Sequence, residues 1–506
     1  MTIDFKNKIR PHRSFNRPNL DEYNQDLSIF ESDRGRIINS AAIRRLQQKT
    51  QVFSLERNAA VRSRLTHSME VQQVGRFISQ QIFKSLGKAK QDEFGLTNLD
   101  RQFESIVEMS CLMHDVGNPS FGHFGEGAIN QWFGDYIQAF VKRKDIADDA
   151  ISLKPLITDI CAFEGNAQAL RIVHSLQTLN LTYTQMSGII KYTRRADQAK
   201  PTEKENDSKS YLKKKAGYYL SEVDIIDAVN KTLNIQEGCR SPFAYVMEAA
   251  DDISYCIADI EDAVEKGILK FDELLIRLKE EYQTIINNGK FSVYENEISL
   301  MEQLIANNLY RYNKTKIVSD FFVPFRVALN TRSVKHASKQ FIDNIDAIYH
   351  GTYNQALVED YSSSHALLET LKSVAFKHVF CAPEVQKQEL QGYRIIAGLL
   401  DIYKPLLDLD RETFTAIINK ADQTPLYQTR LCNKLSSKHL RAYQDAIKPE
   451  TLKEFKSHFT TDENLRIISD NAWEFYFRCR LIQDYISGMT DQFAYDEYRA
   501  LHVIEN

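Results

Sequence analysis

Cysteine is scarce in this chain and is not clustered. The 506 residues include only seven cysteines, and no two of them form a CxxC pair. The sequence therefore predicts neither a disulfide framework nor a cysteine zinc site, and it favours a reducing compartment. No apolar run approaches the ~18 residues of a membrane-spanning helix, and Met1–Arg17 lacks the apolar core of a signal peptide. We expect a soluble, cytoplasmic protein with no membrane association.

Glycine, proline and strand signals are scarce as well. The chain holds 19 glycines and 11 prolines, and alternating apolar–polar segments bounded by tight turns are rare. Apolar residues instead recur at helical intervals, which predicts an all-α fold. The net charge of −4 gives the molecule no general attraction to nucleic acid, so any such site would need a local basic patch.

Helical periodicity is clearest in a few segments that follow a polar lead-in over 1–30. Thr66 is the predicted N-cap of a long helix, which places His67 in its first turn. A polar loop over 196–210 is expected at the surface, outside any core. The other helical segments are 31–53, 103–115 and 242–268.

His114 and Asp115 stand at the end of the helix predicted over 103–115, directly before the turn Gly117-Asn118-Pro119. Imidazole and carboxylate together suit a divalent cation. Adjacent helical positions point about 100° apart, so this pair cannot surround an ion, and other segments must supply further ligands. His67 and Asp251 are candidates, each on a strongly helical segment.

Each candidate has a plainer interpretation when taken alone. A histidine at a helix start is more often a cap or a surface residue. Asp251 and Asp252, on an otherwise apolar helix, could form a structural salt bridge, because unpaired carboxylates beside a core are costly. The lysines at 213–215 would ordinarily form a solvated face. The combination of His67, His114-Asp115 and Asp251 is far more specific than its parts.

This combination resembles the HD metal-dependent phosphohydrolase superfamily. Longer stretches resemble the bacterial deoxyguanosine triphosphate triphosphohydrolases across nearly the whole chain. The resemblance implies an HD-type catalytic helical core over 31–270 and a helical region over 271–506 that completes the substrate pocket and the oligomer contacts. The stretches are ESDRGRII from Glu31, RRLQQKTQVF from Arg44, RLTHS from Arg64, EAADDISY from Glu248, ELQGYR from Glu389 and LIQDYISGMTD from Leu481.

The resemblance also implies the metal ligands and the catalytic pair. One Mg²⁺ or Mn²⁺ ion would be held by His67, His114, Asp115 and Asp251. Asp251 is preferred over Asp252 because the corresponding ligand stands four residues before a substrate-facing tyrosine, here Tyr255. His123 and Glu126 would act as the acid–base pair, with His123 near the leaving 5′ oxygen or the attacking water and Glu126 orienting it.

Substrate contacts follow from the same resemblance. The phosphate side would be bound by Arg64, Asn118, Lys191, Tyr192 and Lys215. The sugar would contact Gln51 and Tyr255, with Asp259 approaching the sugar or holding Tyr255. Guanine would be read by Glu389 and Arg430, with Phe380 nearby. The segment 419–428 departs from the family pattern in length and charge, so a broader base preference stays open.

The expected activity is hydrolysis of dGTP to deoxyguanosine and tripolyphosphate, with water attacking the α-phosphate. The resemblance implies a homohexamer and a single-stranded DNA activator. One alternative is a broader dNTP triphosphohydrolase, or an HD phosphohydrolase acting on another nucleotide. A different class of alternative is a regulatory protein that binds single-stranded nucleic acid and has kept only the fold.

Overall fold

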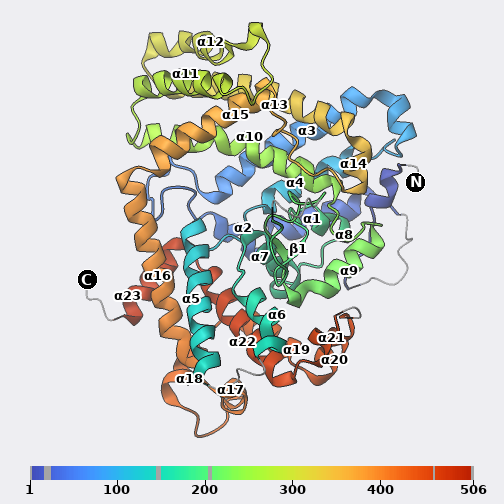
Figure 1. The fold of residues 1–506 in the computed structure, drawn as a ribbon, viewed down its shortest axis with the longest axis vertical. Helices are drawn as coiled ribbons and strands as arrows, with labels where there is room; N and C mark the ends of the chain where they lie inside the picture. The colour runs from blue at the N-terminus through green and yellow to red at the C-terminus, as the bar shows by residue number, and fades with distance from the viewer. Residues whose placement is uncertain (1–2, 16–23, 144–149, 203–207, 460–461, 503–506) are drawn as a thin grey trace.

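The computed structural model describes residues 3–15, 24–143, 150–202, 208–459 and 462–502 (Figure 1). Helices make up 69% of the structure and strands 2%, so the predicted all-α class is confirmed. Within the described ranges, no helix is both long and apolar enough to cross a membrane.

Three helices form the layer that carries most of the candidate site: α3 (Arg64–Glu93), α4 (Asp100–Met113) and α10 (Pro242–Glu265). The predicted N-cap of α3 was wrong by three residues. Ser63 is the cap, and its side chain accepts from the Thr66 amide while the Thr66 hydroxyl accepts from the Ser63 amide. This capping box satisfies helix-end amides reciprocally, so the helix begins one turn earlier.

The segment predicted as helical over 31–53 is divided in two. Helix α1 (Leu27–Ile38) ends at Asn39, and Ser40 then caps the short helix α2 (Ala41–Leu46) by accepting from the Ile43 amide. The residues after α2 form a loop that reaches the start of α3. This loop brings Gln51 to the candidate site.

The N-terminal lead-in is polar in composition, but its apolar residues are buried. Phe5 and Ile9 are fully buried in the core that α3 and α10 build. The Lys8 ammonium donates to the carbonyl groups of Leu233 and Asn234. Residues 3–15 are therefore part of the fold, while 16–23 of the predicted lead-in lie outside the described residues.

The described residues of the predicted loop over 196–210 contain no helix or strand, but the segment does not lie entirely at the surface. Strand β1 (Arg194–Arg195) pairs in parallel with β2 (Ala216–Tyr218), which carries Ala196 inward. Ala196 is 1% exposed and packs with Ala216 and Tyr219, so the prediction that this segment stays out of the core was wrong at that residue. Residues 203–207 of the loop lie outside the described residues.

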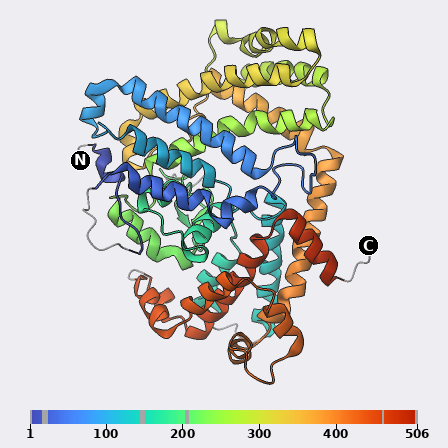
Figure 2. The same cartoon turned by 180° about the vertical axis from the view of Figure 1, so that it is seen from behind.

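The boundary predicted at 270 does not separate two hydrophobic cores. Helices α13 (Ser319–Asp343) and α15 (Ser363–Ala375) pack on α3 and α10, and one apolar cluster runs from Phe5 to Val385. In Figures 1 and 2 these C-terminal helices cover the same layer as α3. The chain after 270 completes the core that the earlier helices begin.

A second cluster joins early and late helices on the other side of the site. Helix α16 (Pro383–Leu407) packs along α5 (Gly122–Arg143), with α22 (Asp470–Ser487) and α23 (Asp491–Leu501) against it (Figure 1). The remaining α-helices are α6 (Ala150–Ile160), α7 (Gly165–Arg171), α8 (Tyr183–Ser187), α9 (Val223–Thr232), α11 (Phe271–Asn287), α12 (Leu300–Thr315), α14 (Ile345–His350), α17 (Arg411–Ile418), α18 (Leu426–Cys432), α19 (Ser437–Ala446), α20 (Pro449–Ser457) and α21 (Glu463–Ile467).

Candidate active site

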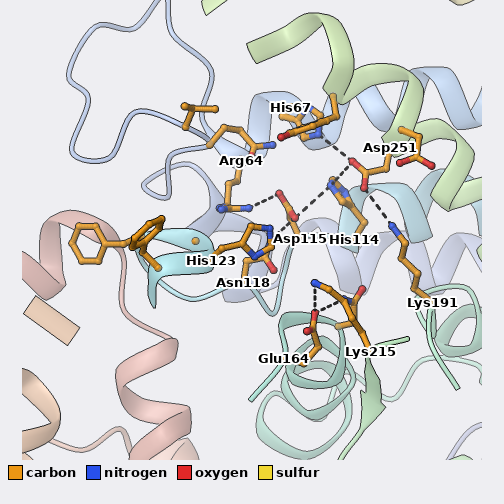
Figure 3. Close-up of a pocket in the computed structure, with 18 of the residues that line it drawn as sticks. Arg64, His67, His114, Asp115, Asn118, His123, Glu164, Lys191, Lys215 and Asp251 are labelled. Carbon is orange, nitrogen blue, oxygen red and sulfur yellow. Dashed lines mark hydrogen bonds and ion pairs between the residues drawn. The ribbon is translucent and has the colours of Figure 1, made fainter. Parts of the chain in front are cut away.

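A cavity of about 420 Å³ lies where these two clusters of helices meet. That size is typical of pockets for nucleotide-sized ligands. Side chains from α3, α4, α5, α10 and α16 reach it, together with the loop after α2 and the segment before α7 (Figure 3). The cavity therefore gathers residues from most of the length of the chain.

Three predicted metal ligands converge on one side of this cavity. The Nε2 atoms of His67 and His114 each lie 3.4 Å from the same oxygen, Oδ1 of Asp251 (Figure 3). One donor atom from each residue lies within 4.8 Å of the other two. The three residues come from the first turn of α3, the C-cap of α4 and the middle of α10.

The chemistry of this trio fits a divalent cation. The Nδ1 atom of His114 lies 2.7 Å from the Cys111 carbonyl oxygen and donates to it, so in the neutral ring the lone pair is on Nε2, the atom that faces Asp251. Two imidazole nitrogens and a carboxylate around one point form a donor set of the kind that binds such ions.

Electrostatic coupling within the trio is strong. Burial alone would raise the pKa of Asp251, but the charge of His114, the hydrogen bond from His67 and the nearby Lys191 hold it well below its usual range. Burial alone would lower the pKa of His67, and Asp251 reverses this effect, so that the pKa is raised. The carboxylate is thus ionised and ready to bind a cation at neutral pH.

The fourth predicted ligand, Asp115, lies beside the trio. Its Oδ1 is 3.5 Å from His114 Nε2 and accepts from the Asn118 amide at 2.5 Å. Its Oδ2 accepts from the Arg64 guanidinium at 2.9 Å. The structure thus brings Asp115 to the edge of the cluster, with its oxygens held by two other predicted site residues.

Asp252 occupies a different environment from Asp251, as its place on the helix predicts. Its carboxylate lies 3.8 Å from the Lys372 ammonium on α15. Burial raises the pKa of Asp252 to about 6, against the opposing charges of Lys372 and Lys191. The group that could hold an ion contains Asp251, whereas Asp252 faces Lys372, so Asp251 stays the predicted ligand.

The predicted acid–base pair is formed directly. His123 Nδ1 lies 2.9 Å from Glu126 Oε2, and the other Glu126 oxygen accepts from the Gly165 amide at 2.9 Å. The hydrogen bond to Glu126 raises the pKa of His123. Burial would raise the pKa of Glu126, but the hydrogen bond and charge of His123, with the charge of Lys215, lower it. The His123 side chain is 82% exposed and Glu126 is buried, so the pair presents its imidazole to the cavity.

Three cationic side chains surround the rest of the cavity: Arg64, Lys191 and Lys215. Lys191 is 3.6 Å from Glu248 and 3.9 Å from Asp251, distances longer than hydrogen bonds. Its pKa is raised: burial would lower it, and the nearby Glu248 outweighs burial. Lys215 pairs with Glu164 at 3.2 Å. The lysines of 213–215 are half-buried, and Lys215 lines the cavity, so the run is not only a solvated face.

Most other predicted contacts line the same cavity, and two do not. Gln51, Asn118, Tyr192, Tyr255, Phe380 and Glu389 line it, and the rings of Tyr255 and Phe380 lie 6.3 Å apart.

Asp259 lies behind the cavity, buried, and accepts a hydrogen bond from Tyr255. Burial raises the pKa of Asp259 to about 7. The structure thus supports the interpretation in which Asp259 holds Tyr255, not the one in which it meets the ligand. Arg430 is exposed on α18 and does not line the cavity of its own chain.

Two polar residues at the start of α7, Glu164 and Asn166, also line the cavity, and no role was predicted for them. The glycine between them, Gly165, is the feature of the sequence that could have indicated them. A Cβ atom at Gly165 would lie 2.2 Å from the Asn118 side-chain oxygen and 3.1 Å from Glu126. Polar residues around a glycine that lies this close to other polar side chains are typical of a binding loop.

No protein-family model matches the chain.

Proposed function

We propose that the protein is a metal-dependent triphosphohydrolase that converts dGTP to deoxyguanosine and tripolyphosphate. The observation that carries the proposal is the convergence, in one cavity, of the trio His67, His114 and Asp251 with three cationic side chains and the pair His123–Glu126. A triphosphate needs several positive charges, and its hydrolysis needs a polarised phosphorus and a proton donor.

The trio is the proposed site for one Mg²⁺ or Mn²⁺ ion, with Asp115 beside it. Such an ion would polarise the α-phosphate and lower the pKa of an attacking water. The chain's own residues do the rest of the positioning. Arg64 orients Asp115 through its guanidinium, and Asn118 does so through its amide.

His123 is the proposed general acid. Because Glu126 raises its pKa, more of its imidazole is protonated near neutral pH. The protonated ring can donate a proton to the 5′ oxygen as the bond between this oxygen and the α-phosphorus breaks. Glu126, fixed by the Gly165 amide, holds the ring in place and stabilises its charge.

Lys191 and Lys215 are the proposed partners of the outer phosphates. Lys191 is surrounded by carboxylates at distances too long for hydrogen bonds, so its ammonium can donate to a phosphate without first breaking a close ion pair. The Tyr192 ring lies beside this ammonium, with its centroid 5.9 Å away. The triphosphate would then lie between the trio and the segment that carries Lys215.

Two substrate ranges are proposed, dGTP alone or several dNTPs. Glu389 lines the cavity and can accept from the N1–H and the amine of guanine, which supports dGTP. Arg430 is outside the cavity of its own chain, which favours the second candidate, a broader dNTP triphosphohydrolase. The hydrogen bond from Tyr255 to Asp259 holds the tyrosine beside the cavity, which supports Tyr255 as the proposed sugar contact in either case.

A single assay tests the proposal. The protein is incubated with Mn²⁺ and each of the four dNTPs in turn, and the phosphate products are identified by ³¹P NMR. Tripolyphosphate from dGTP supports the proposal, and equal turnover of all four dNTPs selects the broader enzyme. Pyrophosphate, orthophosphate or no turnover would contradict it, and binding of single-stranded DNA without turnover would favour the regulatory alternative. Light scattering with and without DNA tests the predicted hexamer and activator.

A further inference from the structure

The junction of α22 and α23, from Ser487 to Asp491, contacts residues 118–124 directly, although the two segments are more than 360 positions apart in the chain. We call residues 118–124, which carry His123, the catalytic segment. The Ser120 hydroxyl donates to the Met489 carbonyl at 2.7 Å, and the Phe121 amide donates to Asp491 Oδ1 at 3.2 Å. Ser120 and Asp491 are both almost completely buried. No step proposed above uses this turn.

The residue whose amide donates to Asp491 has an unusual backbone conformation. Phe121 has φ of 61°, in the left-handed region that non-glycine residues rarely adopt, and Gly122 follows with φ of 55°. Phe121 directly precedes α5 and Gly122 is its first residue, so this turn sets the position of His123 at the cavity. A strained turn persists only when its surroundings hold it, and Asp491 accepts from the amide at its centre.

The second oxygen of Asp491 holds a different part of the cavity wall. Oδ2 accepts from the Thr50 amide at 3.0 Å and from the Thr50 hydroxyl at 2.6 Å. Thr50 precedes Gln51, which lines the cavity, and it bridges to Ser63, the cap of α3. One buried carboxylate therefore joins the wall that carries His123 to the wall that carries Gln51 and His67.

Lys49 makes a parallel connection. Its buried ammonium donates to the carbonyl oxygens of Asn118, at 2.5 Å, and Ser487, at 3.1 Å. The Lys49 carbonyl in turn accepts from the Arg64 amide at 2.8 Å. The loop at Thr50, the catalytic segment and the junction of α22 and α23 are thus joined twice, by the Asp491 carboxylate and by the Lys49 ammonium.

We propose that Asp491, assisted by Lys49, is a positioning residue of the active site: it fixes the strained turn at Phe121, and with it His123, relative to the loop at Thr50. The role of His123 in this inference rests on the proposed function. Asp491 does not itself line the cavity, so it acts through the residues that it holds.

Asp491→Asn tests this with little change of shape. An amide offers only one acceptor oxygen, so either the Phe121 amide or the Thr50 pair loses its partner. We expect kcat to fall about ten- to a hundredfold, because small displacements of a catalytic group are costly. KM should change less than about threefold, because Lys191 and Lys215, which are proposed to bind the triphosphate, lie outside these contacts.

Asp33→Asn is the matched control. Asp33 is fully buried on α1 and accepts from the amide and the hydroxyl of Thr182, the same pairing that Asp491 makes with Thr50, but it lines no part of the cavity. It should lower the melting temperature without lowering kcat. A loss of kcat in both variants in proportion to their loss of stability would overturn the inference, as would Asp491→Asn activity within about twofold of the unmodified enzyme.

Hydrogen–deuterium exchange separates this inference from the proposed function. Asp491→Asn should increase exchange at 118–124 and 48–54, and Asp33→Asn should increase it only near its own partners, Thr182 and Arg13. If the unmodified protein hydrolyses no dNTP, the proposed function fails, and exchange alone decides whether the turn is held. Should Asp491→Asn not fold, Thr50→Val removes one bond to the same oxygen. Unchanged exchange in the variant that folds would overturn the positioning role.

Discussion

His123 Nδ1 lies 2.9 Å from Glu126 Oε2, and this contact raises the pKa of an imidazole that faces the cavity. Glu126 is held on its other side by the Gly165 amide. The pair therefore couples the start of α5 to the start of α7, and the protonation of His123 depends on a carboxylate that solvent hardly reaches.

Glu126→Gln should shift the pH dependence of turnover. Glu126 raises the pKa of His123, so the protonated ring persists to higher pH in the folded protein. If that ring is the acid, kcat declines as pH rises through this pKa. Removing the negative charge lowers the pKa, so the decline should begin at lower pH. The pH–rate profile checks this, with Glu474→Gln, a buried glutamate paired with Arg478 on α22, as the control. An unshifted profile would remove His123 from the acid role.

Asp251→Asn should abolish binding of Mn²⁺, whereas Asp252→Asn should preserve it. The amide keeps the shape of Asp251 but removes the charge that both imidazoles face. Removing a residue that only hydrogen-bonds to a metal ligand costs about 10–100-fold in metal affinity, so removing a ligand itself should cost at least about 100-fold. Titration calorimetry measures both variants. Equal affinity losses in the two would refute the assignment of the distal ligand.

Lys191→Met should weaken binding of a triphosphate far more than it disturbs the fold. A hydrogen bond to a charged group contributes about 1.5–3 kcal/mol, so KM should rise about ten- to a hundredfold. Glu248 keeps its bonds from Arg240 and Tyr211 in this variant. Lys200→Met, on the exposed part of the 196–210 segment, is the control. Equal KM values for the two variants would show that Lys191 does not contact phosphate.

Gly117→Ala should be strongly destabilising. A Cβ atom there would lie 1.9 Å from the Gly165 carbonyl oxygen and 2.3 Å from the Ala169 amide nitrogen, so α7 would have to move. We expect a loss of about 3 kcal/mol or more in the free energy of unfolding, at the upper end for overpacking. Gly127→Ala, exposed on α5 with no atom within 4 Å of the added Cβ, should instead gain up to about 1 kcal/mol. Urea unfolding compares the two; similar stabilities would show that α7 yields easily.

The sequence by itself determined the helical class and predicted the residues of the candidate metal site. Periodicity and caps are encoded within a few residues, so the all-α class and the helices that carry His67, His114 and Asp251 could be predicted, with errors of one turn at ends such as Ser63. The preference for Asp251 over Asp252 came from the resemblance, which places the ligand four residues before a substrate-facing tyrosine, and helix geometry adds only that the two carboxylates point about 100° apart.

Only the tertiary structure decided how distant segments meet. It turned Asp115 toward Arg64 and Asn118, placed Asp259 behind Tyr255, and left Arg430 outside the cavity of its own chain. It also buried Phe5 in a core shared with helices beyond 270, and it brought Asp491 to Thr50 and Phe121. These contacts join residues up to 441 positions apart. Local spacing carries no information about them, because they arise only when whole helices pack and bring their ends together.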